Sequence, residues 1–252
     1  MKVLELVQEK LAAEEASRDL EAGNRYNEDF KYFDFHHDRL VYLFSLGEKY
    51  FFPGAQFLDI GSLFGYVCLG YQLIGYDSKG LDLKKYVDQF AWRFQDWKID
   101  NRACDLEKEK IPFADNEFDL LLASEILEHF RFHPVRFFQE AARVTKPGGR
   151  LIITTPNLVR LNNVLKMIIG RSINWDINDN YWDGAHAREF TVAEIRELAE
   201  KNNWQVEKIE FRNFSYPNLS RTVKAINYLS GLIWPKRKGN LVVILKKYKD
   251  NI

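Results

Sequence analysis

Cysteine and methionine are scarce in this chain of 252 residues, which contains two of each. Cys68 and Cys104 do not form a CxxC pair, so neither a zinc site nor a disulfide framework is predicted. No apolar run reaches the roughly 18 residues of a membrane span. The acidic, amphipathic first segment is not typical of a signal peptide. A reducing, cytoplasmic setting is therefore the expectation.

An excess of charge of one sign is also missing, because 36 basic residues balance 36 acidic ones. This balance disfavours a surface built mainly to bind a polyanion such as RNA or DNA. The charge is uneven along the chain, since residues 211–252 contain nine Lys or Arg and one acid, Asp250. We interpret this segment either as a solvated basic tail or as a contact for a phosphate-bearing substrate or an anionic membrane.

Apolar residues are plentiful, at 46% of the chain, and they occur in short runs that alternate with helical patterns. Such runs, bounded by turn or helix signals, predict buried strands at residues 56–60, 72–76, 118–123, 150–154, 205–211 and 240–247. Helices are predicted at 3–22, 36–50, 134–144 and 191–202. The last helix opens with the capping-box spacing of Thr191 and Glu194. This alternation predicts an α/β fold with a parallel sheet.

Two segments lie outside the alternation. Residues 1–50 are predicted to form an N-terminal helical cap on one domain that spans residues 51–252. Residues 157–188 fit no strand and are interpreted as a lid or insertion. Aromatic residues stand beside amides and acids there, a composition that suits a sugar ring or a small apolar core, at Trp175, Tyr181 and Trp182.

Motifs whose residues suit the binding of a nucleotide-like ligand follow the predicted strands. In LDIGSLFG, residues 58–65, a strand ends with an acid, and a glycine turn leads to a helix whose free N–H groups suit a ligand carboxylate. In IGYD, Asp77 follows the next strand and suits the two hydroxyls of a ribose. In ACDL, Asp105 and Leu106 suit the edges of an adenine. Two further motifs are FDLLLASE and RVTKPGGRL, and the order of all five makes chance a poor explanation.

On these motifs, together with HAREFTVAEIRELAEKNNW, residues 50–250 resemble the class I S-adenosylmethionine-dependent methyltransferases. The resemblance is greatest to the group of ubiquinone-pathway and glycan or natural-product O-methyltransferases. It implies a doubly wound, Rossmann-like, seven-stranded sheet with the last strand antiparallel. One departure concerns the cofactor loop, where Leu63 and Phe64 replace a glycine and a small residue. The resemblance implies cofactor-binding roles for Asp59, Gly61, Ser62, Gly65, Asp77, Asp105, Leu106, Ser124 and Glu125.

An ExxEH cluster follows the fourth motif strand, and its i, i+3, i+4 spacing predicts one helical face. With His186 it resembles the arrangement in small-RNA 2′-O-methyltransferases, which implies Mg²⁺ or another divalent ion gripping a substrate hydroxyl. Without a metal, His129 or His186 is a candidate general base. A third interpretation is structural. The predicted metal ligands are Glu125, Glu128, His129 and His186.

Three functions therefore stay open from the sequence. The first is O-methylation of a small molecule or of a sugar or glycan precursor. The second is metal-assisted ribose 2′-O-methylation of RNA, which the neutral charge disfavours. The third is a non-catalytic cofactor-binding module, for which Leu63 is the motivation. Residues 219–235, ahead of the basic Lys236–Lys238, are also predicted to rest on a membrane interface or to cover the active site.

Overall fold

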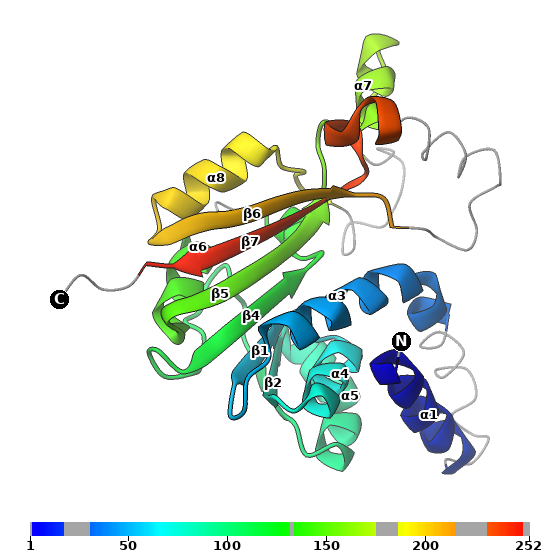
Figure 1. The fold of residues 1–252 in the computed structure, drawn as a ribbon, viewed down its shortest axis with the longest axis vertical. Helices are drawn as coiled ribbons and strands as arrows, with labels where there is room; N and C mark the ends of the chain where they lie inside the picture. Colours follow the sequence, from blue (N-terminus) through cyan, green and yellow to red (C-terminus); the bar gives the residue numbers. More distant parts are fainter. Residues whose placement is uncertain (1, 18–30, 132–133, 175–185, 215–230, 249–252) are drawn as a thin grey trace. The chain divides into compact units, whose positions relative to one another are not determined.

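The structure is a computed structural model that describes residues 2–17, 31–131, 134–174, 186–214 and 231–248 (Figure 1). The chain divides into two compact units, Met1–Ala103 with Phe214–Ser220 and Cys104–Asn213 with Arg221–Ile252. The predicted organisation, a cap over residues 1–50 and one domain over residues 51–252, stays a prediction. No helix among the described residues is long and apolar enough to cross a bilayer.

The first unit contains three parallel strands in the order β3-β2-β1. Helices α1 and α3 both contact α4, so the predicted N-terminal helices pack within this unit. Two hydroxyls hold α3 in place. Tyr71 on α4 donates to the Leu43 carbonyl, and Tyr76, just before β2, donates to the Gly47 carbonyl, both over 2.9 Å. The elements are α1 Lys2–Ser17, α3 His37–Tyr50, β1 Gln56–Ile60, α4 Tyr66–Ile74, β2 Asp77–Asp82, α5 Lys84–Asp96 and β3 Asp100–Ala103.

The second unit contains four strands in the order β4-β5-β7-β6. Strands β4 and β5 are parallel, and β7 lies between β5 and β6, antiparallel to both. The seven strands and the antiparallel last strand are therefore confirmed. The elements are β4 Phe118–Ser124, η2 Leu127–His129, α6 Val135–Val144, β5 Thr145–Pro156, α7 Leu161–Ile168, α8 Val192–Glu200, β6 Trp204–Arg212, η3 Pro235–Arg237 and β7 Asn240–Lys247.

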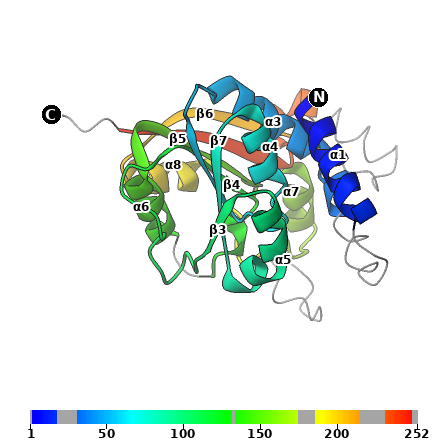
Figure 2. The same ribbon diagram turned by 90° about the horizontal axis from the view of Figure 1, so that it is seen from below.

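The central position of β7 explains its composition. All five residues from Leu241 to Leu245 are fully buried, because strands cover both edges of β7 and side chains cover both faces. Helices α6 and α8 contact each other and lie on one face of these strands (Figure 2). The core of the second unit therefore forms between this helical layer and the sheet.

The predicted strand at residues 72–76 is wrong. Residues 72–74 complete α4, and Gly75 ends that helix with a φ of 120° before β2 begins at Asp77. Strand β2 has the sequence DSKGLD, in which Leu81 is the single large apolar residue, so its pattern does not stand out. Strand β3 (DNRA) was not predicted for the same reason.

The predicted lid is described in part. Residues 161–168 form α7, whereas residues 175–185, which include the three aromatic residues at 175, 181 and 182, lie outside the described residues. Of the predicted amphipathic segment at 219–235, the structure describes residues 231–235. The role of the lid in substrate binding thus stays a prediction.

Candidate active site

The loop after β1 has a backbone that depends on glycine. Gly61 and Gly65 have φ angles of 84° and 78°, and a Cβ on Gly65 would lie 2.9 Å from the rings of Phe94 and Trp97. The N–H groups of Gly61 and Ser62 donate to the Leu81 carbonyl at 2.8 and 3.1 Å. The loop is thereby tied to the end of β2 and leads directly into the N-terminus of α4, where free N–H groups favour an anionic ligand.

Leu63 takes the backbone conformation that favours glycine. Its φ is 39°, and its N–H donates to Asp82 Oδ2 over 2.7 Å. A left-handed conformation costs a non-glycine residue about 1 to 2 kcal/mol, and this hydrogen bond offsets part of that cost. The departure from the family pattern therefore leaves the loop with a glycine-like φ at this position.

The strand-end position predicted for Asp77 is wrong. Asp77 begins β2, pairs with Gln56 at the start of β1 and is exposed, so it lies at the opposite end of the strand pair from Gly61. Asp82 is the acid that ends β2, where the carboxyl ends of parallel strands share one edge. Its carboxylate accepts from the N–H groups of Leu63 and Leu83, both over 2.7 Å. Burial raises the pKa of Asp82.

Asp59 lies beneath the loop rather than at its surface. It is only 3% exposed, and Cys68 Sγ on α4 donates to its Oδ2 at 3.6 Å. Burial raises the pKa of the Asp59 carboxyl to about 7. Both cysteines are free and buried.

In the second unit, Ser124 and Glu125 lie at the carboxyl end of β4. The Ser124 hydroxyl shares a 2.9 Å hydrogen bond with the hydroxyl of Thr154 on β5, which donates to Glu125 Oε1 over 2.8 Å. Asn240 Nδ2 on β7 donates to Glu125 Oε2 at 3.5 Å. The Glu125 backbone has a φ of 55°, an uncommon value for a residue with a side chain. Three strand ends therefore fix this carboxylate.

Asp105 and Leu106 follow the end of β3 and are half-buried. The Asp105 carboxylate accepts from Lys108 Nζ at 2.8 Å and from the Glu107 N–H at 3.1 Å. The hydrogen bond from Lys108 lowers the pKa of Asp105. Their contact with an adenine stays a prediction.

Glu128, His129 and His186 come together in the second unit. Their ligand atoms lie within 4.8 Å of one another, and the two imidazole rings meet edge to face with centroids 5.1 Å apart. The Glu128 carbonyl accepts from the N–H groups of Ala187 at 2.8 Å and Arg188 at 3.2 Å, which brings the chain at His186 to η2. Glu128 is fully buried, and Thr155 Oγ1 donates to its Oε2 over 3.0 Å.

Glu125 does not belong to this group of three among the described residues. The prediction of one helical face over residues 125–129 is wrong, because η2 is a single turn that starts at Leu127 and the backbone at Glu125 is left-handed. The predicted four-ligand set is therefore reduced to one carboxylate and two imidazoles.

The carboxylate of Glu189, which no sequence pattern indicated, lies next to His186. Glu189 Oε1 lies 3.6 Å from His186 Nδ1, and Arg160 forms two hydrogen bonds of 2.6 and 2.7 Å to the same carboxylate. Although burial by itself raises the pKa of Glu189, His186 and Arg160 hold it below its usual value. The motif HAREF contains Glu189, but its partner Arg160 is distant in sequence, so nothing in the sequence indicated the pair.

Comparisons with known proteins agree with this arrangement of loops and strand ends. The sequence family described as "Methyltransferase domain" matches residues 58–153. The mitochondrial ubiquinone biosynthesis O-methyltransferase of Mus musculus is 30% identical over 166 residues, which cover 62% of this chain and 43% of that protein. The ubiquinone biosynthesis O-methyltransferase of Maricaulis maris is 31% identical over 131 residues, 49% of each chain.

Solved structures share the fold. An S-adenosylmethionine-dependent methyltransferase from Mesorhizobium loti has a TM-score of 0.59 at 18% identity, over 81% of this chain and 96% of that one. One from Methanosarcina mazei has a TM-score of 0.60 at 16% identity, over 81% and 98% of the two chains. Residues 58–153 thus match a methyltransferase-domain family, and the chain shares the fold of these S-adenosylmethionine-dependent methyltransferases. It spans about half the length, or less, of the curated relatives it matches.

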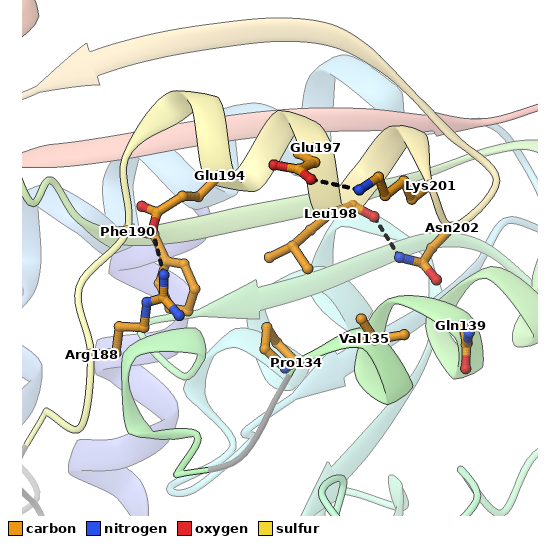
Figure 3. A pocket seen from close by; sticks show the side chains of 10 residues that line it. All are labelled: Pro134, Val135, Gln139, Arg188, Phe190, Glu194, Glu197, Leu198, Lys201 and Asn202. Atoms are coloured by element: carbon orange, nitrogen blue, oxygen red, sulfur yellow. Dashed lines mark hydrogen bonds and ion pairs between the residues drawn. The ribbon is translucent and has the colours of Figure 1, made fainter.

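The second unit also has a hollow whose lining includes none of the predicted site residues. This hollow, of about 420 Å³, lies between α6 and α8 (Figure 3). Its charged groups pair with one another, since Arg188 binds Glu194 and Lys201 Nζ lies 2.6 Å from Glu197 Oε1. Because these groups are already paired, the hollow offers a ligand little unmatched charge. It is lined by Pro134, Val135, Gln139, Arg188, Phe190, Glu194, Glu197, Leu198, Lys201 and Asn202.

Proposed function

We propose that this protein transfers a methyl group from S-adenosylmethionine to an oxygen atom of a small molecule. The observation that carries the proposal is the loop of residues 61–65, whose glycine-dependent backbone is tied to the carboxyl end of β2 within a methyltransferase domain. Two matched relatives named as O-methyltransferases of ubiquinone biosynthesis favour an oxygen acceptor. A sugar or glycan precursor is the finer candidate for the acceptor.

The cofactor site proposed here differs from the sequence prediction at one residue. Asp82 takes the role of ribose acceptor in place of Asp77, because Asp82 ends β2 beside the loop. The bound cofactor supplies an electrophilic methyl carbon on sulfur. The roles of the remaining residues are carried over from the family as part of this proposal, at Asp59, Gly61, Ser62, Gly65, Asp105, Leu106, Ser124 and Glu125.

His186 is the proposed general base. As the acceptor oxygen forms its bond to the methyl carbon and the carbon–sulfur bond breaks, the hydroxyl proton passes to His186 Nε2. Glu189 beside Nδ1 keeps the proton of the imidazole on Nδ1, so that the lone pair of the ring lies on Nε2. His129, whose ring meets His186 edge to face, positions the acceptor or the base.

In a more specific version of this proposal, the same side chains hold a divalent ion. Glu128, His129 and His186 would hold it, and the ion would lower the pKa of an acceptor hydroxyl. Two imidazoles and one carboxylate fit a transition metal or Zn²⁺ better than Mg²⁺, which prefers oxygen ligands. The donor set therefore favours an ion other than the Mg²⁺ suggested by the sequence.

The test measures S-adenosylhomocysteine binding by calorimetry, and turnover of S-adenosylmethionine with a panel of phenols, diols and sugars. We expect cofactor binding in the wild type and a loss of turnover of about a hundredfold or more in His186→Asn. His37→Asn, an exposed histidine of α3, is the control and should retain turnover. A folded protein that binds no S-adenosylhomocysteine would falsify the proposal.

Metal removal separates the two versions of the site. If His186 acts alone as the base, turnover survives treatment with a chelator. If an ion is held, the chelator abolishes turnover, and Mn²⁺ or Zn²⁺ restores it to the wild type but not to His129→Asn.

The two alternatives from the sequence are not favoured. RNA ribose methylation has less support than small-molecule methylation, given relatives named for ubiquinone biosynthesis. The non-catalytic module depended on Leu63, whose φ of 39° is compatible with a cofactor loop. The cytoplasmic location stays a prediction, and four matched relatives are named as mitochondrial.

A further inference from the structure

Two residues at the start of α7 hold the Glu189 carboxylate. Arg160 donates from Nη1 to Oε2 over 2.6 Å and from Nη2 to Oε1 over 2.7 Å, and such a bidentate pair fixes the plane of a carboxylate. Asn163 Nδ2 adds a third hydrogen bond, to Oε2 over 2.8 Å. Only 9% of the Glu189 side chain is exposed. The carboxylate is therefore fixed with Oε1 on the side of His186 Nδ1, 3.6 Å away.

The amide of Asn163 is placed for its two donor hydrogens. The residue is fully buried, and Nδ2 also donates to the Leu158 carbonyl over 2.9 Å. The Oδ1 atom is buried and has no hydrogen-bond partner within the described part of the chain. A buried acceptor without a partner destabilises a fold, so such an arrangement needs a reason. The hydrogen bond to Glu189 supplies one, because it orients a second buried polar group.

The backbones on either side of this carboxylate are joined as well. The Leu158 N–H donates to the Phe190 carbonyl over 3.1 Å, and Asn157 pairs with Phe190 in an isolated β-bridge. The Arg160 N–H donates to the Asn157 carbonyl over 2.9 Å. All of these residues belong to the second unit. The start of α7 is thereby held beside residues 186–190, so its side chains can set the orientation of a group in that segment.

We propose that Arg160 and Asn163 are positioning residues for His186 and act through Glu189. They hold Oε1 opposite Nδ1, so the neutral imidazole carries its proton on Nδ1 and its lone pair on Nε2. This role rests on the proposed function, in which Nε2 accepts a proton or holds an ion. Both versions of the site need the lone pair on Nε2, so the role of the two residues is the same in each.

The first test determines the tautomer of His186 and needs no substrate. Ring-nitrogen NMR spectra are recorded on the full chain, labelled with ¹⁵N-histidine, with a chelator present and at about pH 9, where an ordinary imidazole is neutral. His186→Asn assigns the signals. We expect the Nδ1-protonated form to dominate in the wild type and to become the minor form in Arg160→Met and Asn163→Leu. The matched controls are the exposed residues Arg171 and Asn162, and Arg171→Met and Asn162→Leu should keep the wild-type tautomer.

The second test measures kinetics with a substrate that the wild type methylates. Loss of the outer partner of an active-site histidine costs about ten- to a hundredfold in activity. We expect kcat to fall by this factor in Arg160→Met. The Kd of S-adenosylhomocysteine should stay unchanged, because Arg160 is not among the proposed cofactor-binding residues. An equal fall in Arg171→Met would contradict a positioning role.

The outcomes separate this role from the proposed function. A wild type whose His186 carries the proton on Nε2, or variants that keep the wild-type tautomer and kcat, would overturn the role of Arg160 and Asn163. A folded wild type that binds no S-adenosylhomocysteine overturns the proposed function, and the spectra still report the tautomer. Thermal unfolding shows whether each variant is folded. If Arg160→Met does not fold, the double variant Arg160→Met, Glu189→Met decides, because it removes both charges together and should also lose the Nδ1-protonated form.

Discussion

Asp82 shows how a single residue position depends on the strand that carries it. The carboxylate is fixed by two backbone N–H groups, one from the cofactor loop and one from the start of α5. A carboxylate has about four lone-pair positions, so acceptor capacity remains for two ribose hydroxyls. The acid that we propose as the ribose acceptor is therefore five residues after Asp77.

The substitution Asp82→Asn should weaken S-adenosylhomocysteine binding. Loss of hydrogen bonds to a charged acceptor costs about 1.5 to 3 kcal/mol, or roughly a ten- to hundredfold increase in Kd. Calorimetric titration measures this change directly. Asp77→Asn is the matched control, with an unchanged Kd expected, and a larger effect in Asp77→Asn than in Asp82→Asn would return the ribose role to Asp77.

At the residue scale, three of the four predicted metal ligands lie together in the structure, and the fourth lies elsewhere. Glu128, His129 and His186 were predicted from an ExxEH spacing and a distant histidine, and the structure brings them together. Glu125 was included because a helical spacing was assumed, whereas its side chain bonds to Thr154 and Asn240. Spacing rules apply within one element, and here the element starts two residues later.

At the scale of elements, α8 was predicted most completely. Its N-terminus has both halves of the capping box, since the Thr191 hydroxyl accepts from the Glu194 N–H and the Glu194 carboxylate accepts from the Thr191 N–H. These contacts join residues three apart, so sequence alone contains the information. By contrast, β2 and β3 are short polar strands held by their neighbours, and local patterns do not reveal them.

Removing the cap should destabilise the protein without affecting the cofactor loop. Thr191→Ala is expected to lower the free energy of unfolding by about 1 kcal/mol, because the first turn of α8 loses a side-chain acceptor. Urea unfolding measures this change, and Thr191→Ser, which keeps the hydroxyl, should stay within experimental error of the wild type. Equal destabilisation by both exchanges would show that the methyl group, and not the cap, matters.

At the scale of the whole molecule, a buried acid links stability to pH. Burial raises the pKa of Asp59 to about 7 in the folded protein, against 3.8 for an ordinary aspartate. Between these two values the folded state holds a proton that the unfolded state has released. The contribution of Asp59 to stability therefore falls as the pH rises from about 4 to about 7, and changes no further above that range.

The substitution Asp59→Asn removes this pH dependence of stability. The variant should match the wild type near pH 4 and become progressively more stable than the wild type up to pH 7, by an amount on the order of 4 kcal/mol. Urea unfolding of the cofactor-free protein across this pH range measures the difference. Asp77→Asn, at an exposed site, serves as the control and should show no such trend. A difference that is constant with pH would contradict a raised pKa of Asp59.

The distribution of charge is also a property of the whole molecule. The chain is neutral as a whole, yet the acid-free segments at 157–174 and 231–239 are hydrogen-bonded to each other at one end of the sheet. The sequence predicted a basic C-terminal segment. Only the fold shows that a second acid-free segment is hydrogen-bonded to it.

The sequence by itself determined the elements and motifs whose information is local. These are the glycine loop at 61–65, the capped helix α8, the apolar strands β1, β4 and β7, and through them the methyltransferase fold. The tertiary structure decided which acid ends β2, which side chains surround His186 and which apolar groups stay exposed. The reason is physical, because hydrogen bonds between strands and between distant loops set those positions, and their partners lie tens of residues apart in the chain.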